Sequence, residues 1–127
     1  MTNHLADWHH VITSRDIAKL DDILAANATF HSPVVHTPQV GKDITKMYLS
    51  AAFHILLNDS FHYVREVADD NNAILEFMVV VDGIQVNGVD MIRWDQDGKI
   101  IDFKVMLRPY KAINLIKEKM REMLESA

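Results

Sequence analysis

The stretch AILEFMVVVDGIQVNGVDMIRW, residues 73–94, decides the fold, because two alternating segments flank the dipeptide Asp82-Gly83. A period of two in side-chain character is typical of a β-strand whose two faces meet different surroundings. Asp-Gly is a favoured pair in two-residue hairpin turns, since both turn positions require a positive φ. The stretch therefore predicts an antiparallel hairpin with its turn at residues 82–83.

Two further segments with the same period extend this hairpin into a meander. They cover residues 60–68 and 99–108, and polar turns at 69–72 and 95–98 separate them from the hairpin. Turns of this kind between alternating segments indicate consecutive antiparallel strands. A fifth, short strand is expected at Thr29–Ser32, where the chain enters a loop that contains two prolines.

The remaining segments have helical spacing. Apolar residues recur at intervals of three and four within 5–26, which indicates two short consecutive helices, and again over 44–55. A last helix is expected after Pro109, a residue that is tolerated in the first turn of a helix. The predicted fold class is α+β, with a bent antiparallel sheet, three N-terminal helices and a C-terminal helix.

Composition limits the partners of the chain. Its 127 residues suit one domain, 1–127, and the net charge of −5 argues against a protein that binds the phosphates of nucleic acid. The absence of cysteine excludes disulfides, and neither a leader nor an apolar run of about 20 residues is evident. We expect a cytoplasmic protein without a membrane or nucleic-acid partner.

Asp90 is the most informative single residue. Counting outward from the 82–83 turn pairs Leu75 with Asp90, and a pairing of Trp94 with Lys99 places Phe103 opposite Asp90 on the other side. Asp90 is then the only acid on an otherwise apolar sheet face, where desolvation would raise its pKa. The alternatives are a buried acid that donates a hydrogen bond or moves a proton, and a structural acid bonded to the backbone or to Trp8.

Histidines supply the other candidate groups. His31 lies where the first strand enters the loop, and counting back from a pairing of Ala68 with Ala73 places His62 on the same face as Asp90. Either imidazole could act as acid or base near neutral pH. No two of the seven histidines have the spacing of a metal site on one helix, so no metal and no cofactor is expected.

The two faces of the sheet have different predicted uses. The first three helices and the inner face are expected to enclose an apolar pocket for a small hydrophobic ligand, lined by Trp8, Ile12, Tyr48, Ala52, His62, Phe77, Ile92 and Phe103. The outer face is too apolar for solvent alone, which predicts a homodimer formed through Met78, Met91, Arg93, Lys104 and Met106.

Two stretches, residues 15–33 and 89–100, are similar to the ketosteroid isomerase branch of the nuclear transport factor two-like superfamily, which includes SnoaL-like proteins. The resemblance implies a cone-shaped roll and places Asp90 at the family's oxyanion-hole aspartate. It also places Ser32 where the family has its catalytic base, and Trp8 where the family has its oxyanion tyrosine. The steroid-isomerase set of groups is therefore incomplete in this chain.

Three functions remain open on these grounds. One is an isomerase, cyclase or lyase acting on a small apolar carbonyl compound, with Asp90 donating to a developing oxyanion and His31 moving the proton. Another is a protein that binds such a compound without chemistry. A third is a dimeric scaffold that recruits a partner through the outer sheet face.

Overall fold

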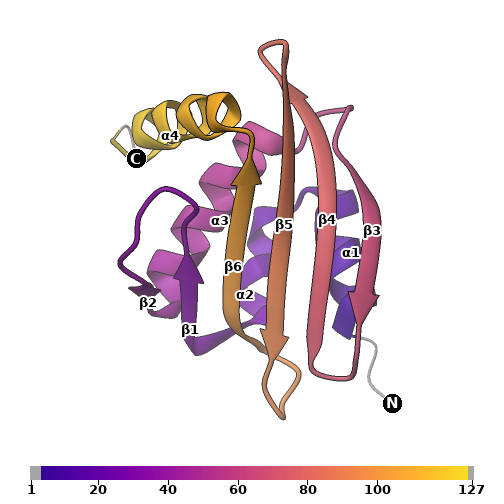
Figure 1. Ribbon diagram of the computed structural model, residues 1–127. Helices are drawn as coiled ribbons and strands as arrows, with labels where there is room; N and C mark the ends of the chain where they lie inside the picture. Colours follow the sequence, from indigo (N-terminus) through magenta and orange to yellow (C-terminus); the bar gives the residue numbers. More distant parts are fainter. Residues whose placement is uncertain (1–3, 126–127) are drawn as a thin grey trace.

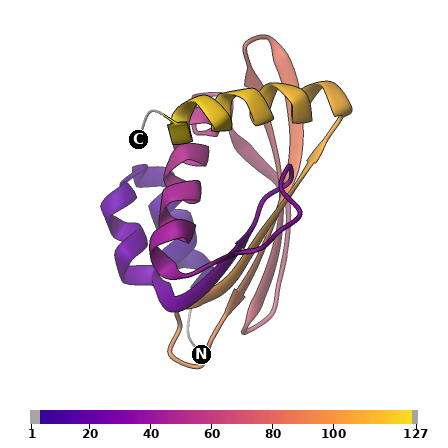
Figure 2. The same ribbon diagram turned by 90° about the vertical axis from the view of Figure 1, so that its left-hand side faces the viewer.

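The computed structural model describes residues 4–125, which form one curved sheet with helices on one face (Figures 1 and 2). The elements in chain order are α1 (His4–Ser14), η1 (Ile17–Lys19), α2 (Leu20–Ile23), β1 (Leu24–His31), β2 (Gln39–Val40), α3 (Lys42–Leu56), β3 (His62–Ala68), β4 (Asn72–Val81), β5 (Ile84–Trp94), β6 (Ile100–Arg108) and α4 (Tyr110–Glu125). The six strands lie in the order β2-β1-β6-β5-β4-β3. Figure 2 shows α1, α2 and α3 on the inner face of the sheet, with α4 across one end.

The α+β prediction is confirmed, but the sheet is mixed and not fully antiparallel. β1 runs parallel to β6, with His31 opposite Lys104, whereas β3 to β6 form the predicted antiparallel meander. β1 begins at Leu24, so the second predicted helix is shorter, and the first strand longer, than the periodicity indicates. As strand residues, Leu24, Ala28 and Phe30 are buried in the core, and this burial outweighs the local helical pattern.

The central hairpin has the predicted register. Val81 opposes Ile84 and Leu75 opposes Asp90, while Asp82 and Gly83 have φ values of 50° and 76°. These positive values are those that the two-residue turn requires, which is why the local sequence sufficed for the pairing.

The next register differs from the prediction by two residues. Asp90 opposes Val105 rather than Phe103, and Phe103 instead opposes Ile92. One residue of the shift comes from the turn, because Trp94 pairs with Ile100 and not with Lys99, and the second comes from a bulge in β6, where Arg93 pairs with Asp102 and Ile101 is left as an extra residue. A shift of two residues keeps Phe103 on the inner face, so the pocket face remains largely as expected.

Candidate functional site

An apolar cavity lies between the inner sheet face and helices α1, α3 and α4. It has about 50 Å³ of space for the centre of a water-sized sphere, which is several times the roughly 10–15 Å³ that one water needs by this measure. Its walls are Trp8, Ile12, Phe30, Ser32, Pro33, Val34, Leu49, Ala52, Phe53, Leu56, Leu57, Phe61, Phe77, Asp90, Phe103, Val105, Leu107, Ile116 and Met120. All five phenylalanines of the chain therefore line one cavity.

Asp90 is the only ionisable side chain among the described residues that line this cavity. It lies on β5, where strand alternation turns it inward between the positions of Gly88 and Ile92, and it is 7% exposed. Burial raises the pKa of this carboxyl from 3.8 to about 7, and the hydrogen bond from Tyr63 opposes part of that rise. Near neutral pH, a large fraction of Asp90 is therefore a neutral acid.

Tyr63 holds one oxygen of Asp90. Its hydroxyl donates to Asp90 Oδ2 at 2.8 Å and accepts from Trp8 Nε1 at 3.0 Å. Desolvation, followed by the negative charge of Asp90, raises the pKa of Tyr63 well above its ordinary value. Tyr63 thus stays protonated and orients the carboxyl, while Trp8 holds the tyrosine oxygen in place.

The second oxygen of Asp90 is available to a ligand. Oδ1 has no hydrogen-bond partner within residues 4–125. Every fully buried polar side-chain atom in this part of the chain does have a partner, so Oδ1 is not fully buried. Oδ1 therefore keeps contact with open space, and the space that Asp90 borders is the cavity. When protonated, this oxygen can donate a hydrogen bond to a ligand's carbonyl oxygen.

Five of the predicted lining residues line the cavity in the structure: Trp8, Ile12, Ala52, Phe77 and Phe103. Tyr48 and Ile92 do not. Tyr48 stacks on Phe30 with ring centroids 5.3 Å apart, and Ile92 is buried in the core that α1 covers. Both support the wall from behind without forming part of it.

The position predicted for His62 is wrong. His62 opposes Met78 on the outer face, is exposed, and bonds through Nδ1 to the Ser60 carbonyl at 2.9 Å. A bulge at Val64 makes Tyr63 oppose Phe77 while Arg65 opposes Glu76. This one extra residue exchanges the faces, so that Tyr63 takes the inner position that uninterrupted alternation assigns to its neighbour.

His31 does not face Asp90 either. Phe30 points into the cavity, so His31 points to the outer face, where its Nε2 lies 2.9 Å from Asp102 Oδ1. The structure therefore separates the two predicted catalytic residues by the thickness of the sheet. The predicted role of His31 in moving a proton beside Asp90 has no geometric support.

Ser32 occupies the position that the resemblance assigns to a catalytic base. It borders the cavity, and its Oγ accepts a hydrogen bond from the Val34 amide at 3.1 Å. A hydroxyl held in this way is a poor base, and none of the other lining residues described is a base. The cavity thus contains one acid and no second proton-transfer group.

Sequence reasoning missed more than half of the lining, including most of the phenylalanine wall and the α4 residues Ile116 and Met120, and it also missed Tyr63 behind Asp90. The helical spacing of Ile116 and Met120 was visible in the sequence, but not the side of the molecule on which α4 would pack. No group of three His, Cys, Asp or Glu side chains between residues 4 and 125 is arranged to hold a metal ion.

An α+β roll that encloses an apolar cavity with a single buried carboxyl has the geometry that a small-molecule site requires. Residues 5–103 match the model of the SnoaL-like domain family. The chain belongs to this family, and it is similar over most of its length to solved members of the same fold.

Three solved structures illustrate the relationship. A steroid delta-isomerase from Pseudomonas aeruginosa is 38% identical, with 97% of this chain and 90% of that chain covered at a TM-score of 0.91. An uncharacterised protein with a cystatin-like fold from Silicibacter pomeroyi is 26% identical, with 96% and 85% covered and a TM-score of 0.87. The third is SalBIII, an epoxide hydrolase/cyclase-like enzyme with a role in pyran ring formation in the polyether salinomycin. It shares the fold at 16% identity and a TM-score of 0.66, with 83% of this chain and 88% of that chain covered.

No curated protein matches the chain. Within residues 4–125, no helix has both the length and the apolar character needed to cross a membrane.

Proposed function

We propose that the protein binds a small, mostly apolar carbonyl compound and promotes an intramolecular rearrangement of the isomerase or cyclase type, with Asp90 as the acid. The observation that carries the proposal is the state of Asp90, which is buried, held by Tyr63 through one oxygen, and open to the cavity through the other. A neutral carboxyl in a dry pocket stabilises negative charge that develops on a carbonyl oxygen. The similarity to a steroid delta-isomerase supports a ligand of this kind.

The lack of a second proton-transfer group narrows the chemistry. Removal of a proton from carbon needs a separate positioned base, whereas in a ring closure by the substrate's own hydroxyl the carboxyl that protonates the carbonyl oxygen becomes the carboxylate that takes up the hydroxyl's proton. Asp90 can supply that acid without a partner. We therefore favour a reaction in which the protein donates a hydrogen bond or proton and the cavity holds the substrate in a folded shape.

Binding without chemistry is the second candidate, and the missing base is the observation that favours it. The apolar wall and the single donor in the cavity would hold a carbonyl compound equally well if it left unchanged. The two candidates differ in the fate of the ligand and not in the residues that contact it.

The experiment is a screen of small ketones and enones by native mass spectrometry at pH 6, followed by product analysis of each compound that binds. Asp90→Leu should weaken carbonyl ligands by about 1–3 kcal/mol, since their oxygen loses its donor, whereas Asp90→Asn should keep much of the affinity through its amide. Asp102→Asn, which alters an acid on the outer face, is the matched control and should bind as the unmodified protein does. If Asp90→Leu binds carbonyl ligands as tightly as the unmodified protein does, the proposal is contradicted. If the ligands bind but are recovered chemically unchanged, the result supports the second candidate, binding without chemistry.

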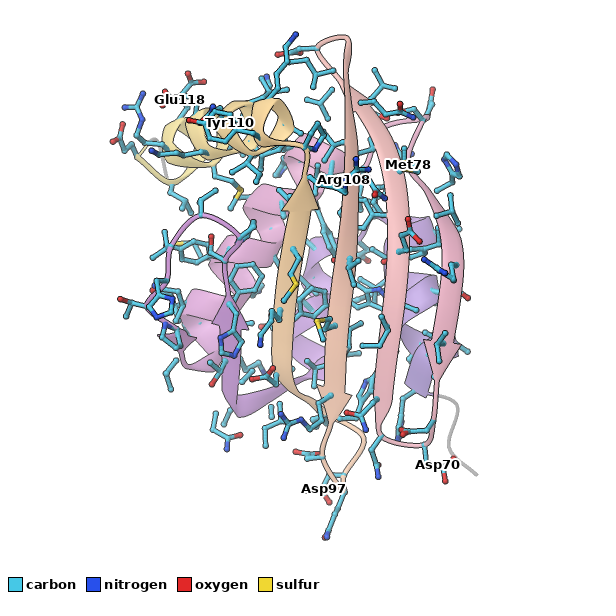
Figure 3. All side chains as sticks on the ribbon, in the orientation of Figure 1. Asp70, Met78, Asp97, Arg108, Tyr110 and Glu118 are labelled. Atoms are coloured by element: carbon cyan, nitrogen blue, oxygen red, sulfur yellow. The ribbon has the colours of Figure 1, made fainter. Side chains whose placement is uncertain are left out.

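We further propose a homodimer through the outer sheet face, which is the near face in Figure 3, where Met78 and Arg108 are labelled. Ile74, Val80 and Met106 are 40%, 45% and 52% exposed on the described surface. A polar ladder crosses this face: Arg65 and Asn87 donate to Glu76, and Arg108 donates to Asn87. Apolar area interrupted by satisfied polar groups is characteristic of a protein interface.

A further inference from the structure

Three polar side chains form a hydrogen-bonded row beside the cavity. The indole Nε1 of Trp8 donates to the hydroxyl of Tyr63 at 3.0 Å, and that hydroxyl lies 2.8 Å from Asp90 Oδ2. The three residues come from α1, β3 and β5, so only the folded chain brings them together. Trp8 and Asp90 are 1% and 7% exposed, so water competes little for either end of the row.

The first member of the row sets its direction. An indole N–H can only donate, so the oxygen of Tyr63 accepts from Trp8. The single hydroxyl proton of Tyr63 has one acceptor within residues 4–125, which is Asp90 Oδ2. The other group at hydrogen-bond distance from this hydroxyl is the N–H of Trp8, which offers no acceptor. A reversed hydroxyl would therefore leave its proton unpaired, and Tyr63 donates to Oδ2 instead of accepting from it.

This direction determines which oxygen of neutral Asp90 holds the acidic proton. Oδ2 already accepts the proton of Tyr63, and a second proton on Oδ2 would point at the same bond. The acidic proton consequently lies on Oδ1, the oxygen that is open to the cavity. An oxygen that bears a proton pairs with a ligand group that accepts, whereas a bare oxygen pairs with one that donates.

Aromatic packing restricts the two rings of the row. Trp8 meets Phe53 and Phe103 with ring centroids 5.9 Å and 5.0 Å apart. Phe61 meets the ring of Tyr63 in an edge contact at 5.2 Å. Because these contacts oppose rotation of either ring, the N–H and the hydroxyl have little freedom to find other partners.

We propose that Trp8 is a positioning residue that directs the proton of neutral Asp90 to Oδ1, and that it thereby makes the cavity select ligands that accept a hydrogen bond over ligands of the same shape that donate one. This inference rests on the proposed function, because it takes the cavity as the binding site. Trp8 acts through Tyr63 and Asp90, although its ring also forms part of the wall.

The selectivity follows from the number of protons to be paired. A ketone needs one donor and finds it at Asp90 Oδ1. An alcohol of the same shape brings a proton of its own, and the only other side-chain acceptor among the described lining residues is Ser32 Oγ, which already accepts from the Val34 amide. An unpaired hydroxyl proton in an apolar cavity weakens binding by at least about fivefold. Were the row reversed, Oδ1 would be an acceptor and the alcohol would lose this disadvantage.

The test compares 2-indanone with 2-indanol, two achiral probes that differ in this one group. Dissociation constants are measured by NMR titration of the full chain at pH 6, where Asp90 is mostly neutral. The unmodified protein should bind the ketone at least about fivefold more tightly than the alcohol. The carbonyl carbon of the bound, carbon-13-labelled ketone should resonate downfield of its position in Asp90→Leu, because accepting a hydrogen bond deshields it.

The decisive variant carries 3-benzothienylalanine in place of Trp8 only, so that a sulfur atom replaces the indole N–H while the bicyclic ring keeps its shape. It should abolish the preference for the ketone and move the carbonyl resonance toward its position in Asp90→Leu. Trp8→Phe also removes the N–H and should act in the same direction. Phe53→Leu, which reduces a ring of the same wall and leaves the row intact, is the matched control. It should weaken both probes alike and keep their ratio.

The outcomes separate this inference from the proposed function. If the unmodified protein binds both probes equally, or if the benzothienyl variant keeps the preference, the inference is overturned while the carbonyl pocket stands. Loss of the preference in Phe53→Leu as well would also overturn it, since the effect would then follow the bulk of the wall and not the N–H. A purely structural role of Trp8 predicts weaker binding of both probes at an unchanged ratio. If neither probe binds the unmodified protein, the pocket itself is contradicted, and the role of Trp8 is overturned with it.

Discussion

Replacement of Asp90 by asparagine should change how the stability of the protein depends on pH. The pKa of the carboxyl rises from 3.8 to about 7 on folding, mainly through desolvation. At about 1.4 kcal/mol for each tenfold change in an ionisation constant, this rise corresponds to about 4 kcal/mol. When the pH is high enough to ionise Asp90 in both the folded and the unfolded state, the free energy of unfolding is lower by this amount.

The sign follows from the proton balance. Below about pH 4 the carboxyl is protonated in both states, and between about pH 4 and pH 7 only the unfolded chain releases its proton. The free energy of unfolding therefore decreases as the pH rises through this interval, and the contribution becomes constant above it. Asparagine cannot ionise, and its amide oxygen can still accept the hydrogen bond from Tyr63.

The assay is urea unfolding from pH 5 to pH 8, followed by the fluorescence of the buried Trp8 and Trp94. The stability of Asp90→Asn relative to the unmodified protein should increase by about 3 kcal/mol between these limits. Asp97→Asn, which changes an exposed acid in the β5–β6 turn, should show no such increase. A constant difference between Asp90→Asn and the unmodified protein over the whole interval would mean that Asp90 ionises freely, and would refute the reasoning.

Four further outcomes are expected. Tyr63→Phe should destabilise the protein by about 1–3 kcal/mol because Trp8 Nε1 loses its acceptor, and carbon-13 NMR should show a further rise in the pKa of Asp90, which Tyr63 now lowers. Gly88→Ala should cost about 1–3 kcal/mol and reduce ligand binding, since a Cβ there would overlap Phe77 and lie 2.8 Å from Leu107; thermal denaturation and titration check both effects. His62→Ala should alter melting and ligand affinity little, within about 0.5 kcal/mol, because the side chain is exposed on the other face; a large loss of affinity would contradict this placement. Sedimentation at micromolar concentration should show a dimer that Met106→Asp dissociates, whereas a monomeric unmodified protein would exclude the proposed interface.

Local signals in the sequence sufficed for the central hairpin and for the inward direction of Asp90. The period of two along β4 and β5, joined by Asp82-Gly83, determines their register from the turn outward, since each pair follows from the one before it. Residues 42–56 and the segment after Pro109 were likewise recognisable as helices from their own spacing. Asp90 could be identified as a buried acid because it interrupts an apolar face.

Only the tertiary structure decided which groups meet Asp90. One extra residue at Val64 turns Tyr63 inward and His62 outward, and one at Ile101 shifts the β5–β6 pairing. The parallel pairing of β1 with β6 sends His31 to the outer face and leaves the β6 edge open beyond Lys104. A strand's side-chain direction alternates at every residue, so a single bulge reverses it, and bulges arise from contacts between distant segments that no local pattern records.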